Sequence, residues 1–166
     1  MDASLTTCFK NDRRPGWKEG RTQRKINGLK FRDMTSEIIY NGELRTTATH
    51  LQSGKSIISD APCDNQGKGE AFSPTDLMAT ALGSCMMTIM GIKASDKGIE
   101  LVGAKCTVNK IMASEPRRIG KVEVTFYMPQ NHFSEAEKSL LVEAAKGCPV
   151  CRSLSGEVEV QLEFVW

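Results

Sequence analysis

The sequence has few of the features that mark a membrane, secreted or nucleic-acid-binding protein. Its formal net charge is only +2, so a general nucleic-acid binder is not indicated. Residues 1–25 contain no apolar run of the kind that a secretory signal needs. The longest uncharged run, Leu77–Ile92, has 16 residues and is too short and too rich in small residues for a membrane span. We therefore expect a cytoplasmic protein without membrane or nucleic-acid partners.

Two further absences narrow the chemistry. The chain has only two histidines, His50 and His132, and neither has the spacing of a catalytic Cys/His pair or of a metal site. No phosphate-loop or dinucleotide fingerprint is present. Six cysteines in a cytoplasmic chain favour free or catalytic thiols over a structural disulfide framework. We accordingly expect neither a metal nor a cofactor.

What is present fits one globular domain. The chain has 166 residues, of which 40% are apolar and 25% are charged, and this is typical of a soluble protein with a real core. Residues 1–32 carry nine Lys or Arg against three Asp or Glu, so the remainder is acidic. We interpret residues 1–29 as a basic, poorly ordered leader, although such a stretch could also touch an anionic surface. Residues 30–166 are then a single domain.

Three short strands are predicted first, over 34–40, 43–50 and 55–60. Asn41-Gly42 is a strong two-residue hairpin signal between the first two, and Ser53-Gly54 joins the second pair. A polar loop over 61–72 follows and leads into the main helix.

The main helix is predicted over residues 74–97. Ser73 is a good N-cap, Pro74 suits the first helical position, Asp76 sits at N3, and Gly98 ends the helix. The middle of this helix has no polar face, so it must be covered on all sides. One two-layer subunit offers too little cover, and we therefore predict an interlocked homodimer.

The second half of the domain predicts a long hairpin, a helix and a last strand. The hairpin comprises 101–112 and 119–128 and turns over 115–118. The helix begins at Ser134, with Glu137 at N3, and ends near Gly147; the last strand spans 157–166. This order of elements predicts an α+β fold of antiparallel sheets with helices layered on them.

Two cysteines point to the chemistry. Cys85 lies in the middle of the apolar helix among small residues, and Cys148 lies just past the second helix. A thiol within a helix and a second thiol that can meet it suggest redox chemistry, whereas inert packing is the alternative. Cys106 faces inward on a strand and is expected in the core; Cys63 and Cys8 have no spacing that argues for a function.

The segment Ser73–Cys85, which reads S-P-T-D-L-M-A-T-A-L-G-S-C, and the later Cys148-Pro-Val resemble the OsmC/Ohr family. These are the osmotically induced and organic-hydroperoxide-resistance proteins, and the element order over 34–166 also fits them. The string Gly67–Asp76 looks like an OsmC-like branch distinct from the best-known peroxidases. The resemblance implies a two-layer fold with a buried central helix and an intertwined homodimer. It also implies antioxidant, stress-response activity: a thiol peroxidase for organic hydroperoxides with its sites at the subunit interface.

On this resemblance Cys85 is the peroxidatic thiol and Cys148 the resolving thiol. Oxidation of Cys85 to a sulfenic acid is followed by condensation with Cys148, and an external dithiol reduces the resulting disulfide. Burial disfavours the thiolate that attacks the peroxide, so a nearby cation is required. Arg45 is the best candidate, and Arg152 is the alternative because it is close to Cys148 in sequence.

The sequence departs from the family pattern at the carboxylate that holds this arginine. Peroxidatic members have a glutamate ten residues before the reactive cysteine, where this chain has Thr75. The adjacent Asp76 is expected to cap the helix instead. Glu70 is the candidate to supply the missing carboxylate; a solvated loop charge is the alternative.

Three assignments remain open on the sequence alone. Met86, Ile89 and Phe72 are candidates for an apolar substrate pocket, although methionines at helical spacing also suit a plain core. Cys151 completes a C-x-x-C with Cys148 and is either a backup resolver or a bystander; thioredoxin-like and zinc interpretations are weak. The alternative function is a non-catalytic OsmC-like protein that binds a small apolar ligand between subunits. The contact between Cys85 and Cys148 and the charges around Cys85 distinguish the two functions.

Overall fold

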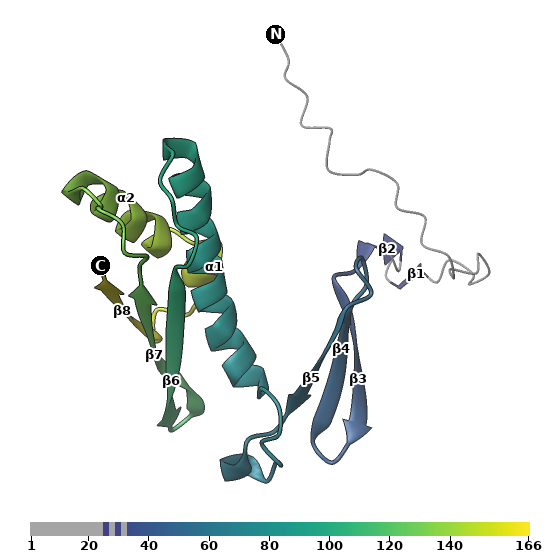
Figure 1. The fold of residues 1–166 in the computed structure, drawn as a ribbon. Coiled ribbons are helices and arrows are strands. Elements are labelled where there is room, and N and C mark those ends of the chain that lie inside the picture. Colours follow the sequence, from purple (N-terminus) through teal and green to yellow (C-terminus); the bar gives the residue numbers. More distant parts are fainter. Residues whose placement is uncertain (1–24, 27–28, 31–32) are drawn as a thin grey trace. The chain divides into compact units, whose positions relative to one another are not determined.

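A computed structural model describes residues 25–26, 29–30 and 33–166 (Figure 1). The chain divides into two compact units. One comprises the described residues up to Glu37 together with Thr49–Ser56, and the other comprises Ile38–Ala48 together with Ile57–Trp166. Cys8 lies outside the described residues. The division into a leader over 1–29 and a domain over 30–166 stays a prediction.

The first unit contains a short strand pair and the turn after the second long strand. Strands β1 (Lys25–Ile26) and β2 (Leu29–Lys30) pair antiparallel. Strand pairing therefore starts a few residues before the position at which we expected the domain to begin. In the turn, the Gly54 N–H donates to the His50 carbonyl at 2.8 Å, where Ser53-Gly54 was expected to join two strands.

The three predicted early strands form one sheet in the order β3-β4-β5. They are β3 (Ser36–Gly42), β4 (Arg45–His50) and β5 (Ser56–Asp60). The hairpin between β3 and β4 turns at Glu43-Leu44, whose φ angles are +51° and +60°, so the expected turn at Asn41-Gly42 is wrong.

The alternation of apolar and polar residues along the strands could not show that the turn lies two residues later than expected. A shift of two residues leaves every side chain on the same face, because the side-chain period of a strand is two. Asn41 belongs to β3 and its Nδ2 donates to Thr47 Oγ1 on β4 at 2.7 Å. The Leu44 N–H donates to the Tyr40 hydroxyl at 3.3 Å, which adds a second tie across the turn.

The main helix, α1 (Pro74–Lys97), begins and ends where the sequence predicts. Ser73 Oγ accepts the Asp76 N–H at 3.1 Å, and the Asp76 carboxylate accepts the Ser73 N–H at 2.8 Å. This reciprocal capping box satisfies two backbone donors at the start of the helix. Gly98 closes the other end with a left-handed φ of +68°, which glycine adopts without strain.

One face of α1 is buried within the chain and the other is not. Leu82, Met86 and Met90 are fully or almost fully buried, whereas Met78 and Ile92 are exposed. By length and composition α1 would pass as a membrane span, as the core helix of a soluble protein also does. The buried face packs on a sheet, which is the behaviour of a core helix.

That second sheet has the order β6-β7-β8. Strands β6 (Lys105–Ser114) and β7 (Arg117–Tyr127) form the predicted antiparallel hairpin. Strand β8 (Glu159–Val165) pairs with β7 in parallel, whereas we expected only antiparallel pairing. A helical crossover separates β7 from β8, and such a crossover returns the chain in its original direction. The α+β class is confirmed.

The crossover contains two helices. The first, α2 (Glu135–Lys146), has the predicted capping box between Ser134 and Glu137. The second, α3 (Pro149–Ser153), was not expected because five residues are too few to show a helical period. Gly147 lies between them with a φ of −78°, so it does not adopt the left-handed conformation that a C′ glycine often has.

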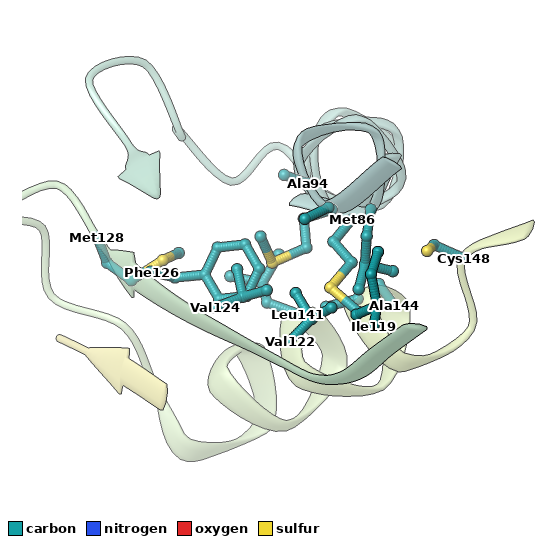
Figure 2. Close-up of a cluster of buried hydrophobic side chains, with 14 residues drawn as sticks. Met86, Ala94, Ile119, Val122, Val124, Phe126, Met128, Leu141, Ala144 and Cys148 are labelled. Atoms are coloured by element: carbon teal, nitrogen blue, oxygen red, sulfur yellow. The ribbon is translucent and has the colours of Figure 1, made fainter. Parts of the chain in front are cut away.

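The core lies between α1, α2 and the sheet (Figure 2). Figure 2 shows Cys148 at one end of this cluster and Met128 at the other. Helix α1 lies close to β6 at Gly83, where a Cβ atom would lie 2.7 Å from Val108 Cγ2. The main buried side chains of the cluster are Leu82, Met86, Met90, Ile119, Val122, Val124, Phe126, Met128, Leu141 and Cys148.

Candidate active site

The structure brings Cys85 and Cys148 together. Cys85 lies midway along α1 and is partly buried, and Cys148 is the fully buried N-cap residue of α3. Helices α1 and α3 contact each other, and the Cys85 thiol lies close enough to Cys148 to raise the pKa of the Cys148 thiol. Both cysteines are free thiols. The proximity required of a peroxidatic and a resolving thiol is therefore present within one chain.

The environment of Cys148 disfavours its thiolate. Burial raises the pKa of the Cys148 thiol, the backbone N–H of Cys151 lowers it, and the Cys85 thiol raises it again, with a raised pKa as the net result. The Cys151 N–H points at the Cys148 sulfur over 3.3 Å. Because the attacking species in thiol chemistry is the thiolate, Cys148 is a poor competitor for a peroxide at neutral pH.

Arg45 is held by two carboxylates. Its Nε donates to Asp60 Oδ1 at 2.8 Å and its Nη2 donates to Asp60 Oδ2 at 2.7 Å, which is the bidentate geometry that a guanidinium prefers. The same Nη2 donates to Glu70 Oε2 at 2.6 Å. The expected pairing of Arg45 with Glu70 is thus observed, and Asp60 is the stronger partner.

The sequence analysis missed Asp60. It is the last residue of β5, and its side chain is only 1% exposed, whereas that of Glu70 is 62% exposed. Its Oδ2 also accepts the Glu70 backbone N–H at 3.1 Å. The Arg45 guanidinium holds the pKa of Asp60 below its usual range, and both carboxylates raise the pKa of Arg45. An acidic residue at the end of the strand that follows Arg45's strand was the available signal.

Among the residues that the structure describes, no hydrogen bond joins Cys85 to a cationic side chain. The recorded partners of Arg45 are Asp60 and Glu70. Arg152 is exposed on α3, and within residues 33–166 no recorded ion pair includes it. The location of Arg45 beside a Cys85 thiolate therefore stays a prediction.

The structure places Phe72 apart from the other two residues that were predicted to line a pocket. Met86 is 0% exposed and belongs to the core cluster, because it shares a helical face with Leu82 and Met90. Ile89 packs partly buried against the same cluster. Phe72 is 57% exposed and lines a separate open depression of about 570 Å³. Met86 thus lies in the core of this chain, as the alternative interpretation expects, and its part in a substrate pocket stays a prediction.

Asp76 performs the capping role expected of it. One carboxylate oxygen binds Ser73, and the other forms an ion pair with Lys110 at 2.9 Å. Partial burial raises the pKa of Asp76, but the hydrogen bonds from Lys110 and Ser73 outweigh it and lower the pKa overall. The neighbouring Thr75 hydroxyl lies 3.0 Å from Ser73 Oγ. Thr75, which lies at the expected glutamate position, and the adjacent Asp76 thus both belong to the first turn of α1.

The remaining cysteines and histidines lie elsewhere. Cys106 lies on β6, packs against the core and has its pKa raised by burial. Cys63 is exposed and its thiol donates to the Lys68 carbonyl at 3.3 Å. His50 contacts Ser53, and His132 is exposed. Across the part of the chain that the structure describes, no group of three or more His, Cys, Asp or Glu side chains is placed to hold a metal ion.

Comparisons with known proteins agree with this architecture. Residues 67–163 match the model of the family described as OsmC-like protein. A crystal structure from Psychrobacter arcticus 273-4, of a protein named for osmotic stress induction and a detoxification response, is 45% identical. It has a TM-score of 0.77, and the match covers 80% of this chain and 96% of that one. No curated protein sequence gives a significant match.

Two more distant structures share the fold. The organic hydroperoxide resistance protein OsmC from Legionella pneumophila is 18% identical, with a TM-score of 0.62. OhrB from Bacillus subtilis, also an organic hydroperoxide resistance protein, is 19% identical, with a TM-score of 0.57. Each match covers 80% of this chain and 98% of the other. The matched family model, the 45% identity and the shared fold together establish that this chain belongs to the OsmC-like protein family.

Proposed function

We propose that this protein is a cysteine-based peroxidase that reduces organic hydroperoxides. The observation that carries the proposal is the proximity of the partly buried Cys85 on α1 to the fully buried Cys148 at the start of α3. The names of the Legionella pneumophila and Bacillus subtilis structures support the class of substrate. Cys85 is the peroxidatic thiol and Cys148 the resolving thiol.

In the first step the Cys85 thiolate attacks the terminal oxygen of the hydroperoxide. The O–O bond breaks, the alkoxide leaves with the electron pair and takes up a proton to become the alcohol, and Cys85 becomes a sulfenic acid. Cys85 suits this step because it is partly accessible, whereas Cys148 is fully buried and its raised pKa keeps it protonated.

In the second step Cys148 attacks the sulfenic sulfur. An S–S bond forms, the S–O bond breaks, and the oxygen leaves as water. Helices α1 and α3 pack together and the Cys85 thiol influences the pKa of Cys148, so we expect this step to need little rearrangement. An external dithiol then reduces the disulfide and restores both thiols. We expect this cycle to operate in the cytoplasm and to need no cofactor.

Arg45 is the group proposed to stabilise the Cys85 thiolate. A guanidinium held by Asp60 and Glu70 has a fixed orientation and keeps its charge at every physiological pH. Since no described contact joins Arg45 to Cys85 within the chain, we propose that Arg45 reaches Cys85 of the partner subunit in a homodimer. Asp60 then replaces the glutamate that the family has where this chain has Thr75.

A homodimer is supported by uncovered apolar surface on β3 and β5. Ile38, Ile39 and Tyr40 are consecutive in β3 and each is more than half exposed, so both faces of that strand lack cover. Ile57 and Ile58 in β5 are exposed to a similar degree. Contiguous apolar surface of this kind in a soluble chain marks an interaction site, and a symmetric second copy is the partner that we propose.

The test is to treat the reduced full-length protein with stoichiometric cumene hydroperoxide or hydrogen peroxide. We expect fast loss of two thiols with the organic peroxide and a Cys85–Cys148 disulfide in peptide maps. Cys85→Ser should abolish turnover, and Cys106→Ser is the matched control that should keep it. Peroxide that is not consumed and thiols that stay reduced would refute the peroxidase. Tight binding of an apolar ligand without thiol loss would instead support the non-catalytic alternative.

A further inference from the structure

Cys151 has no role in the cycle described above, yet it lies beside the resolving thiol. Cys148 is the N-cap residue of α3 and Cys151 lies in the first turn of that helix. Residues three apart along a helix have Cα atoms about 5 Å apart, which is within the range that a disulfide spans. The Cys151 N–H contacts the Cys148 sulfur at 3.3 Å, so that sulfur folds back over the turn that carries Cys151.

Three thiols therefore form one cluster with Cys148 at its centre. Cys85 approaches from α1, and Cys151 approaches from α3. Both act electrostatically on Cys148. All three are free thiols, and two of them, Cys85 and Cys151, are partly exposed, whereas Cys148 is fully buried.

We propose that Cys151 is a second resolving thiol that moves the disulfide from Cys85–Cys148 to Cys148–Cys151. The Cys151 thiolate attacks the Cys148 sulfur, the bond between Cys85 and Cys148 breaks, and Cys85 leaves as the thiolate with the electron pair. One S–S bond is broken and one is formed, so no external oxidant or reductant is needed. This inference rests on the proposed function, since it starts from the Cys85–Cys148 disulfide.

The transfer has two consequences for the cycle. It returns Cys85 to the thiolate form, which is the form that reacts with a peroxide. It also leaves a disulfide whose accessible sulfur belongs to Cys151, so an external dithiol attacks Cys151 and releases the buried Cys148. Oxidation by the peroxide and reduction by the dithiol thereby occur at different sulfurs.

Peroxide stoichiometry and disulfide mapping test the transfer. Wild-type protein receives one equivalent of cumene hydroperoxide, is quenched with an alkylating agent at increasing times, and is peptide mapped. We expect a Cys85–Cys148 link at early times and a Cys148–Cys151 link later, with Cys85 alkylated. A second equivalent should then convert Cys85 to a sulfenic acid that dimedone traps. Cys151→Ser should consume one equivalent, retain the Cys85–Cys148 link and give no dimedone adduct.

A second arm isolates the Cys148–Cys151 pair from the peroxidase. Cys85→Ser protein is oxidised with diamide, and we expect a Cys148–Cys151 disulfide, whereas the matched Cys106→Ser, Cys85→Ser double variant should behave alike. Absence of that link in folded protein would overturn the inference. A persistent Cys85–Cys148 link in the wild type with Cys151 fully alkylated would also overturn it and leave the peroxidase standing. Failure of Cys151→Ser to form any Cys85–Cys148 link would instead count against the proposed function itself.

Discussion

Arg45 binds the buried carboxylate of Asp60 through two parallel hydrogen bonds, Nε to Oδ1 at 2.8 Å and Nη2 to Oδ2 at 2.7 Å. Glu70 adds a third contact from the solvent side at 2.6 Å. The guanidinium is therefore clamped between one buried and one exposed carboxylate, both within the same unit of the chain. The orientation of Arg45 depends mainly on Asp60.

Asp60→Asn should slow the reaction with organic peroxide more than Glu70→Gln does. An amide accepts only one of the two bonds from Arg45, and misplacement of a positioning group costs up to on the order of 100-fold in rate. The pH profile of Cys85 alkylation separates this from a purely structural effect: we expect Asp60→Asn to shift it toward higher pH, since a misaligned cation stabilises the thiolate less. An unchanged profile in both variants would exclude Arg45 from the site.

The contribution of Asp60 to stability should depend on pH with a definite sign. Arg45 lowers the pKa of Asp60 in the folded state. The unfolded chain then binds more protons below the ordinary pKa of about 4, so this contribution is present above that pH and is lost as the pH falls through the folded-state pKa. In thermal unfolding, we expect the wild type to have a higher melting temperature than Asp60→Asn at pH 7. The two melting temperatures should approach each other below about pH 4. A gap that widens on acidification would contradict the pairing.

Gly83→Ala should destabilise the fold. A Cβ at position 83 would lie 2.7 Å from Val108 Cγ2, which forces α1 away from β6 and costs about 1–3 kcal/mol as overpacking. Gly91→Ala is the matched control in the same helix, because its Cβ would meet no atom within 4 Å. It should stabilise the helix by about 0.5–1 kcal/mol. Urea denaturation measures both; a loss at Gly91 as large as that at Gly83 would indicate a second copy packed there.

Ser73→Ala should cost more than Ser134→Ala, although both remove an N-cap from a capping box. An N-cap serine contributes about 1 kcal/mol, and up to about 2 kcal/mol in tightly packed cases. Both serine hydroxyls also donate to the carboxylate at N3 over 2.7 Å, so the difference is burial: Ser73 is buried, whereas Ser134 is exposed. The free energy of unfolding of the two variants decides the order. Equal losses would mean that the burial of Ser73 adds nothing to its capping role.

Ile39→Glu should weaken the proposed homodimer. Sedimentation of the wild type should give twice the 18.3 kDa mass of the chain, and a charge within an apolar interface should shift the protein toward the monomer. Exposed Lys93 on α1 offers a comparison, since Lys93→Glu changes charge without touching β3. A wild type that sediments as a monomer would remove the dimer and, with it, the route of Arg45 to Cys85 of the partner subunit.

Local signals in the sequence were sufficient wherever a terminus is capped. The motif from Ser73 to Asp76 and Gly98 predicts the start and end of α1, and Ser134 with Glu137 predicts the start of α2. These predictions succeed because a cap satisfies backbone donors and acceptors within a few residues of itself, independently of the rest of the fold. Helix α3 was not predicted from the sequence, because its five residues are too few to show a helical pattern of apolar residues.

The candidate site also contains residues that the sequence identifies and residues that only the structure identifies. Cys85, Cys148, Arg45 and Glu70 are identifiable by type and by motif, and the structure joins the first pair and the second pair. Asp60 carries no motif, and its role follows only from the pairing of β4 with β5, which places it against Arg45. The burial of Met86 in the core likewise could not be read from the sequence, because helical spacing does not say which face of α1 meets the sheet.

The sequence by itself determined the boundaries of α1 and α2, the α+β class and the identity of the two candidate thiols, since each depends on contacts over a few residues or on residue type. Tertiary structure alone decided the hairpin turn at Glu43-Leu44, the parallel pairing of β8 with β7, and the burial of Asp60 and Met86. These features depend on which distant segments pack together. A two-residue register shift, a strand direction or the face of an apolar helix leaves the local pattern unchanged, so only long-range contacts select among the possibilities.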